Sequence, residues 1–190
     1  GPGGGNTSLF PMNSRHVSEA NLDGFSELEQ LASETHAAGA AVFVAYNAMY
    51  PAGQVASVRS AIDSAARAGA DGFIVADPGL MDHIHRRHPG KKLIASTLAG
   101  AFNSRTCKVY QRLGAHRVTL PRALTMEEIS ATAAACPGLE FEVFAMSERC
   151  YFPNALCNFE HATYRVRTGF FHAAADLARR ALGRRMSALT

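Results

Sequence analysis

A glycine recurs along this chain wherever an amphipathic stretch gives way to a short apolar run. Five glycines follow this pattern at intervals of 21 to 30 residues: Gly39, Gly69, Gly90, Gly114 and Gly138. Glycine tolerates the left-handed conformation that ends a helix, so each is expected to close a helix and lead into a strand. The intervals fit one helix, one strand and two short loops. The chain is therefore predicted to consist of repeated helix–strand units.

The predicted strands are mostly apolar and do not alternate between apolar and polar residues. They are Val42–Ala45, Phe73–Ala76, Leu93–Ala95, Val118–Leu120 and Leu139–Phe144. Strands that are buried on both faces have this composition, which indicates a parallel sheet covered by helices.

The segments between the strands carry apolar residues at helical spacing, notably Ser26–Ala38, Ser57–Ala68 and Asn103–Leu113. Thr125 and Glu128 form a capping-box pattern that opens a further helix toward Ala135. The sequence thus predicts an α/β fold, either a (β/α) barrel of the TIM type or an open doubly wound sheet. No glycine-rich phosphate turn follows a strand, which favours the barrel.

The predicted barrel is incomplete, because about five strands are visible where a complete barrel has eight. We expect a leader or loop at residues 1–25, a partial barrel at 26–157 and a C-terminal segment at 158–190. An incomplete parallel barrel leaves two unpaired strand edges. A homo-oligomer, or a different partner chain that completes the barrel, is therefore expected.

Composition narrows the classes of function. The 190 residues are 47% hydrophobic, which is enough for a substantial core, and the net charge of +3 gives no general basic field for nucleic acid. No apolar run approaches the roughly 18–20 residues that span a bilayer. No signal-peptide pattern opens the chain, so a cytoplasmic location is expected. In that compartment the four cysteines are free thiols or metal ligands rather than disulfides.

Polar side chains follow the predicted strands where each strand ends. In parallel α/β folds the carboxyl ends of the strands form the site. Arg122 is a candidate for binding an anion or a carboxylate, because it directly follows a buried strand. Asp77 precedes Pro78-Gly79 and could instead cap a helix. The candidate catalytic residues are Arg122, Glu142 and Asp77, and the candidate substrate-binding residues are Asn47, Ser96, Thr97 and Asn103.

Glu140 and Glu142 share one face of the last predicted strand, because side chains alternate along a strand. If Leu139, Phe141 and Val143 face the helices, both carboxylates point into the barrel interior. Buried carboxylates need partners, and Arg122 is the expected one. The alternative is an exposed edge face.

Cys150 and Cys157 stand seven residues apart, just after this strand. A Cys-x6-Cys spacing is by itself a weak metal signal, but its position at the functional end of a strand strengthens it. A zinc site that also used His161 is an alternative. Cys107 and Cys136 are expected to be small buried residues.

Several stretches, taken in order, resemble the collagenase-like peptidase family U32. They are Ala68–Gly79, Ala95–Ala99 with Asn103-Ser104, Leu113–Val118, Leu120–Ile129, and Leu139–Phe144 leading to Cys150. The family includes proteins of oxygen-independent ubiquinone hydroxylation and hydroxylases of tRNA and ribosomal RNA.

The resemblance implies a (β/α) barrel in which Cys150 and Cys157 supply two of the four thiolates of a [4Fe–4S] cluster. It also implies hydroxylation without molecular oxygen, of an aromatic or nucleobase substrate, with prephenate as the oxygen source. No cysteine follows Cys157, and Arg122 is followed by alanine where the family has glutamate. Two alternatives therefore stay open. One is a cluster-free binding or scaffold subunit that completes a partner's barrel, and the other is a metal-independent barrel lyase.

Two basic features have their own interpretations. His83, His85 and His88 lie at the end of a predicted helix, where cations are favoured by the helix dipole, with phosphate or RNA contact as the alternative. Phe170–Ala188 is a predicted basic amphipathic helix that packs on the protein's own core or docks a partner.

Overall fold

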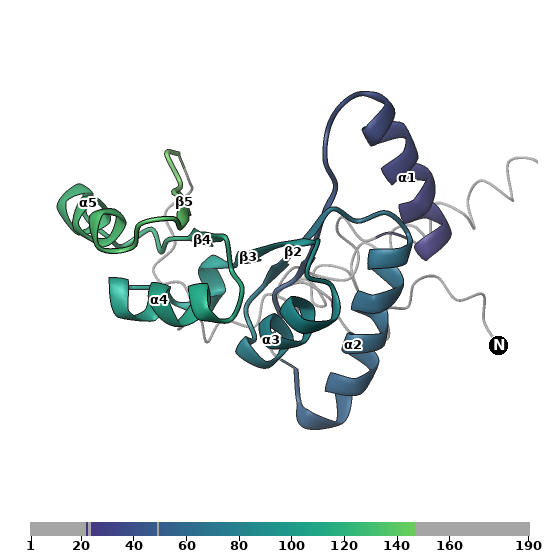
Figure 1. Ribbon diagram of the computed structural model, residues 1–190, viewed down its shortest axis with the longest axis horizontal. Coiled ribbons are helices and arrows are strands. Elements are labelled where there is room, and N and C mark those ends of the chain that lie inside the picture. The colour runs from purple at the N-terminus through teal and green to yellow at the C-terminus, as the bar shows by residue number, and fades with distance from the viewer. Residues whose placement is uncertain (1–21, 23, 49, 147–190) are drawn as a thin grey trace, which may run out of the picture. The chain divides into compact units, whose positions relative to one another are not determined.

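The computed structural model describes residues 22, 24–48 and 50–146, which lie in a compact unit spanning Gly1–Cys157. Five strands and five α-helices alternate along this part of the chain (Figure 1). The strands are β1 Phe43–Tyr46, β2 Gly72–Val75, β3 Lys92–Ala95, β4 Arg117–Thr119 and β5 Glu140–Glu142. The helices are α1 Phe25–Ala37, α2 Ala52–Arg67, α3 Pro78–Arg87, α4 Ser104–Arg112 and α5 Met126–Ala135, with a 3-10 turn, η1, at Thr97–Ala99.

All five strands are parallel and pair in chain order, β1-β2-β3-β4-β5. A doubly wound sheet reverses its strand order at a switch point, whereas a (β/α) barrel adds each strand beside the previous one. The predicted α/β fold with a parallel sheet is therefore confirmed, in the arrangement of a barrel segment.

The hydrophobic core lies between one face of the sheet and the helices. From the strands, Phe73, Val75, Leu93 and Val118 belong to it, and each is at most 2% exposed. The helices contribute residues at helical spacing, such as Val58, Ile62 and Ala65 of α2 or Leu80, Met81 and Ile84 of α3. Because side chains alternate along a strand, the other residues of each strand lie on the opposite face, which corresponds to the interior of a barrel.

Most of the predicted boundaries hold. The capping box is present, with Thr125 Oγ1 accepting from the Glu128 amide and the Glu128 carboxylate accepting from the Thr125 amide. Helix α2 begins at Ala52, five residues before the predicted Ser57. Four of the five glycines have a positive φ, but Gly90 does not, so the predicted left-handed closure of α3 was wrong there. His88 ends that helix instead.

Several sequence predictions concern residues outside the described part of the chain. These are most of the predicted leader at 1–25, the cysteine pair Cys150 and Cys157, the histidine His161, and the C-terminal segment at 158–190 with its amphipathic helix at 170–188. Within the described residues, no helix is both long and apolar enough to cross a membrane.

Candidate functional site

The strand register places five residues at one level on the interior face of the sheet, at the carboxyl ends of the strands. Thr119 pairs directly with Glu142. Asn47, Ala76 and Ser96 each come one residue after the last paired position of β1, β2 and β3, so the register brings them to the same level. We call this level the polar layer: it consists of the four polar residues Asn47, Ser96, Thr119 and Glu142, together with the small residue Ala76. In parallel α/β folds this edge of the sheet carries the site.

Asn47 and Ser96 meet within this layer, as their positions after β1 and β3 predict. The Asn47 side-chain amide donates to Ser96 Oγ at 3.4 Å, across the small side chain of Ala76. Ser96 is 2% exposed, and its Oγ also accepts from the Leu98 amide at 3.2 Å, which caps the short turn η1. Two of the predicted substrate-binding residues are therefore in contact, and one of them, Ser96, is also held by a backbone amide.

Thr119 and Glu142 form the other side of the polar layer. Thr119 is 5% exposed, and its hydroxyl donates to Glu142 Oε1 at 3.5 Å. One level below, Arg117 donates from Nε and Nη2 to Glu140 Oε2 at 2.9 and 2.7 Å, and its Nη1 lies 3.9 Å from Glu142 Oε2. These hydrogen bonds lower the pKa of Glu140. The glutamate face is thus a charged network of one cation and two carboxylates.

The predicted partner of the two glutamates was wrong. Arg117 on β4 forms their ion pairs, whereas Arg122 is the third residue after the end of β4 and is exposed. The two carboxylates do lie on the face opposite the helices, because Leu139 and Phe141 pack with the helical core. Glu140 and Glu142 remain 59% and 50% exposed, so the expected burial of these carboxylates was also wrong.

Asp77 caps a helix. It is the N-cap of α3, and its Oδ1 accepts from the Leu80 amide at 2.9 Å with Pro78 at the first helical position. Tyr50 lies near it: burial raises the pKa of the Tyr50 hydroxyl, and the negative charge of Asp77 raises it further. A role for Asp77 beyond capping stays a prediction.

Asn103 also caps a helix. Its Oδ1 accepts from the Thr106 amide at 3.1 Å at the start of α4, and the residue is exposed. The structure therefore gives Asn103 a structural role and leaves its substrate-binding role a prediction.

Two buried hydroxyls near the same edge lack a hydrogen-bond partner among the described residues. They are Thr97 Oγ1 and Tyr46 Oη, and Tyr46 is fully buried at the end of β1. The Tyr46 hydroxyl lies on the helix-facing side of β1, because Tyr46 pairs with Val75 and its ring contacts Phe73. Thr97 follows Ser96 directly, and a buried hydroxyl without a partner is costly, so Thr97 Oγ1 is the one of the two that stands near the polar layer. Tyr46 and Tyr50 were not among the predicted site residues, since both are aromatic positions that a sequence pattern assigns to the core.

The two described thiols belong to helices rather than to the strand ends, since Cys107 lies on α4 and Cys136 is the C-cap of α5. Burial, with a smaller contribution from nearby Cys136, raises the pKa of the Cys107 thiol to about 11. Cys136 is 1% exposed and its Sγ contacts the Ser104 carbonyl at 3.5 Å. Both are buried core residues, as predicted.

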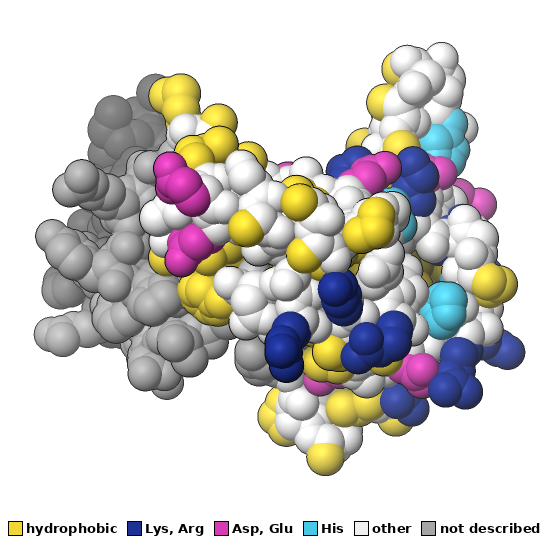
Figure 2. Space-filling model, turned by 60° about the vertical axis from the view of Figure 1, so that its left-hand side comes forward, with side chains coloured by type: hydrophobic (Ala, Val, Ile, Leu, Met, Phe, Trp, Pro, Cys, Tyr) yellow, Lys and Arg dark blue, Asp and Glu magenta, His cyan; other side chains and the backbone are white. Residues whose placement is uncertain are grey.

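The surface of the described part carries mixed charge. Figure 2 shows most of the lysine and arginine side chains in view over the lower part of this face, with hydrophobic and a few acidic side chains between them.

The sequence matches peptidase family U32 over residues 4–168. This match covers most of the chain, so the protein belongs to peptidase family U32. The predicted resemblance is confirmed.

Among characterised relatives, three are informative. The tRNA hydroxylation protein P of Escherichia coli strain K12 is 29% identical over 125 residues, which cover 66% of this chain and 28% of that protein. The tRNA hydroxylation protein P of Helicobacter pylori strain 26695 is 28% identical over 153 residues, or 80% of this chain and 36% of that protein. The tRNA hydroxylation protein P2 of Bacillus subtilis is 34% identical over 94 residues, or 50% of this chain and 30% of that protein. The chain spans about a third of the length of these relatives.

The fold also resembles a solved structure, that of the U32 peptidase Mk0906. The two superpose with a TM-score of 0.57 at 21% identity, over 69% of this chain and 55% of that one. At this identity the likeness supports the fold and no finer property.

Proposed function

We propose that this chain forms part of the barrel of an RNA-hydroxylating protein and that its polar layer contacts the substrate base. The observation that carries the proposal is the polar layer itself, in which one amide, two hydroxyls and one carboxylate stand together at the strand ends. The names of the relatives, which are tRNA hydroxylation proteins, support it. Amide, hydroxyl and carboxylate groups pair with the edges of a nucleobase, which presents both donors and acceptors. A cytoplasmic location is part of this proposal.

The contacts of Ser96 argue against a peptidase mechanism in which Ser96 is the nucleophile. In the described part of the chain its Oγ contacts the Asn47 amide and the Leu98 backbone, and neither is a general base. A serine nucleophile needs such a base within hydrogen-bond distance.

The proposal is tested with a chimera of the E. coli relative. In this chimera the aligned 125-residue segment of the present chain replaces the corresponding segment of the E. coli protein. We expect this chimera, in cells that lack their own protein P, to restore hydroxylated nucleosides in tRNA. A Glu142→Gln change in the chimera should slow hydroxylation about tenfold or more, which corresponds to about 1.4 kcal/mol of lost transition-state stabilisation, and should therefore reduce the amount of these nucleosides. The amount is measured by mass spectrometry of digested tRNA.

Glu29→Gln, an exposed position on α1, is the matched control and should leave the amount unchanged. Immunoblotting establishes that each chimera accumulates. An abundant chimera without hydroxylated nucleosides, or a Glu142→Gln variant as active as its parent, would contradict the proposal.

The cofactor and the oxygen source are part of the same proposal. The family resemblance supports a [4Fe–4S] cluster held by Cys150 and Cys157, with prephenate as oxygen donor. Both cysteines lie outside the described residues, and Cys107 and Cys136, which are buried in the helical core, are not proposed as further ligands. Arg122, exposed after β4, is the proposed contact for an anionic group of the co-substrate.

Iron and sulfide analysis of protein purified without oxygen tests the cluster. We expect iron and sulfide to co-purify with the chain and to be lost in Cys150→Ala, because a cluster needs each of its thiolate ligands. Cys136→Ala, a buried cysteine away from the strand ends, is the control and should retain them. Equal iron content in the Cys150→Ala variant and its parent would remove Cys150 as a ligand.

A second candidate is a cluster-free binding subunit that completes a partner's barrel. It is favoured by the outer strands β1 and β5, each of which pairs on one side only among the described strands. Absence of iron, together with co-purification of a larger U32 homologue, would support this candidate over the first.

A further inference from the structure

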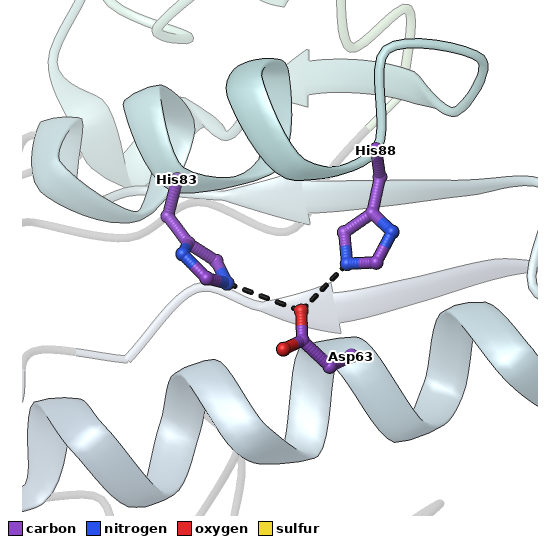
Figure 3. Close-up of side chains that lie close together, drawn as sticks. All are labelled: Asp63, His83 and His88. Carbon is purple, nitrogen blue, oxygen red and sulfur yellow. Dashed lines mark hydrogen bonds and ion pairs between the residues drawn. The ribbon is translucent and has the colours of Figure 1, made fainter.

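Two histidines and an aspartate converge between α2 and α3, away from the polar layer (Figure 3). His83 Nε2 lies 3.2 Å and His88 Nε2 lies 2.6 Å from the same oxygen, Oδ1 of Asp63. The two rings stand edge to face with their centroids 6.4 Å apart. One ligand atom from each of the three residues lies within 4.8 Å of the others. The arrangement brings two imidazoles and a carboxylate to one point.

Rigid elements hold these three side chains. Asp63 follows the fully buried Ile62 on α2, and His83 precedes the fully buried Ile84 on α3. His88 is the C-cap of α3, and its amide donates to the Ile84 carbonyl at 2.8 Å. Ligands carried on packed helices keep their geometry better than ligands on loops.

The cluster is separated from the strand ends that carry the polar layer. In a parallel α/β unit each helix runs opposite to the strands, so helix C-terminal ends lie at the amino ends of the strands. Asp63 is close to the end of α2, and His88 ends α3. The cluster therefore lies toward the opposite edge of the sheet from Ser96 and Glu142.

The side chains are sheltered but accessible. His83, His88 and Asp63 are 18%, 17% and 22% exposed, which leaves room for a water molecule at a bound ion. Burial raises the pKa of Asp63, but the hydrogen bonds from His88 and His83 outweigh it, and the net pKa is lowered. Arg87 also stands near the carboxylate, with its Nε 4.0 Å from Asp63 Oδ2. The Arg87 side chain is 69% exposed and can turn to solvent.

We propose that Asp63, His83 and His88 form a binding site for a divalent transition-metal ion, Zn²⁺ in the first instance, that ties α2 to α3. Two imidazole nitrogens and one carboxylate oxygen, with water as the fourth ligand, are a common zinc donor set. In a tetrahedral site with bonds of about 2.0–2.1 Å, neighbouring ligand atoms stand roughly 3.3 Å apart. The 3.2 Å separation at His83 already meets this value, and His88 needs to withdraw by about 0.7 Å from its present 2.6 Å. The proposal is independent of the hydroxylation function.

The test is zinc binding to the full chain carrying Cys150→Ala and Cys157→Ala, so that ions held by that cysteine pair are not counted. After treatment with a chelator, the chain is titrated with Zn²⁺ alone by calorimetry. We expect one bound ion, and a loss of affinity of about tenfold or more in each of Asp63→Asn, His83→Gln and His88→Gln, since even outer groups of metal sites change affinity by 10- to 100-fold. Bound Co²⁺ should show the intense visible absorption of a tetrahedral ion in the parent and not in these variants.

The matched control is His36→Gln. His36 Nε2 also contacts a carboxylate, Asp71 Oδ2 at 2.8 Å, but a single histidine is present there. This variant should bind Zn²⁺ like the parent. Thermal unfolding without metal establishes that each variant folds, and Zn²⁺ should raise the Tm of the parent and the control alone. No zinc binding by the parent, or equal binding by the three variants, would overturn the proposal.

Discussion

Replacing Phe73 with alanine is expected to lower the free energy of unfolding by about 3–5 kcal/mol. Phe73 lies on the helix-facing side of β2, between β1 and β3, and is fully buried. Its ring contacts that of Tyr46 at a centroid distance of 6.1 Å and a tilt of 54°. Alanine removes this apolar surface and leaves a cavity that paired strands on both sides cannot close.

The loss is measured by chemical denaturation followed by circular dichroism, because the chain contains no tryptophan. Phe25→Ala is the matched control, since Phe25 is 39% exposed on α1, and it should cost about 1 kcal/mol or less. If Phe73→Ala leaves the chain unfolded, Phe73→Leu should show a smaller loss in the same direction. A Phe73→Ala variant as stable as Phe25→Ala would mean that the helices do not pack on this face of the sheet.

The change Gly72→Ala is expected to cost about 1–3 kcal/mol by overpacking. Gly72 opens β2 on the interior face, where a Cβ atom would collide with the backbone carbonyl of Lys92 on β3 and would lie 2.6 Å from the ring of Phe43 on β1. The Phe43 ring can move, but the carbonyl cannot, because it belongs to the paired sheet. The collision is therefore relieved only by displacing a strand.

A double variant separates the two contacts. In the presence of Phe43→Ala, the cost of Gly72→Ala should fall but not vanish, since the Lys92 carbonyl remains. Gly90→Ala is the control, because an added Cβ there meets nothing within 4 Å, and its effect should stay within about 0.5 kcal/mol. Equal free energies of unfolding for Gly72→Ala and Gly90→Ala would contradict the predicted collision between a Cβ atom at position 72 and the Lys92 carbonyl.

The strand–helix order was predictable because it depends on local patterns. Apolar runs marked all five strands, and Thr125 with Glu128 marked the start of α5. The early start of α2 was missed because residues 52–56 lack apolar periodicity, although Pro51 at the N-cap position was a usable signal. The difference at Gly90 arises because α3 ends at His88, which needs no left-handed residue.

The candidate site was predicted only in part because its contacts depend on register. Asn47 and Ser96 were found from their place after strands, and the structure brings them together. Arg117 was missed because it precedes the apolar run of β4, and only the pairing with β5 shows that it faces Glu140.

The convergence at Asp63 was missed for a similar reason. His83 and His88 were interpreted as cations favoured by a helix end, and their partner lies on another helix, 20 and 25 residues earlier in the chain. The rotation of α2 and α3 about their axes decides which residues meet, and helical periodicity alone does not fix which face of one helix meets which face of the next.

The chain-order pairing of the strands has a consequence for how the protein is made. Paired residues such as Phe43 and Gly72, Gly72 and Lys92, or Arg117 and Glu140 are 20 to 29 residues apart. At about 5–20 residues per second, a ribosome supplies each new strand within on the order of 1–6 s of its neighbour. Each of the strands β2 to β5 finds a partner already synthesised, so this part of the sheet can grow in the direction of translation. The contact between Asn47 and Ser96 can then form before Glu142 leaves the ribosome, and the polar layer is assembled from its N-terminal side.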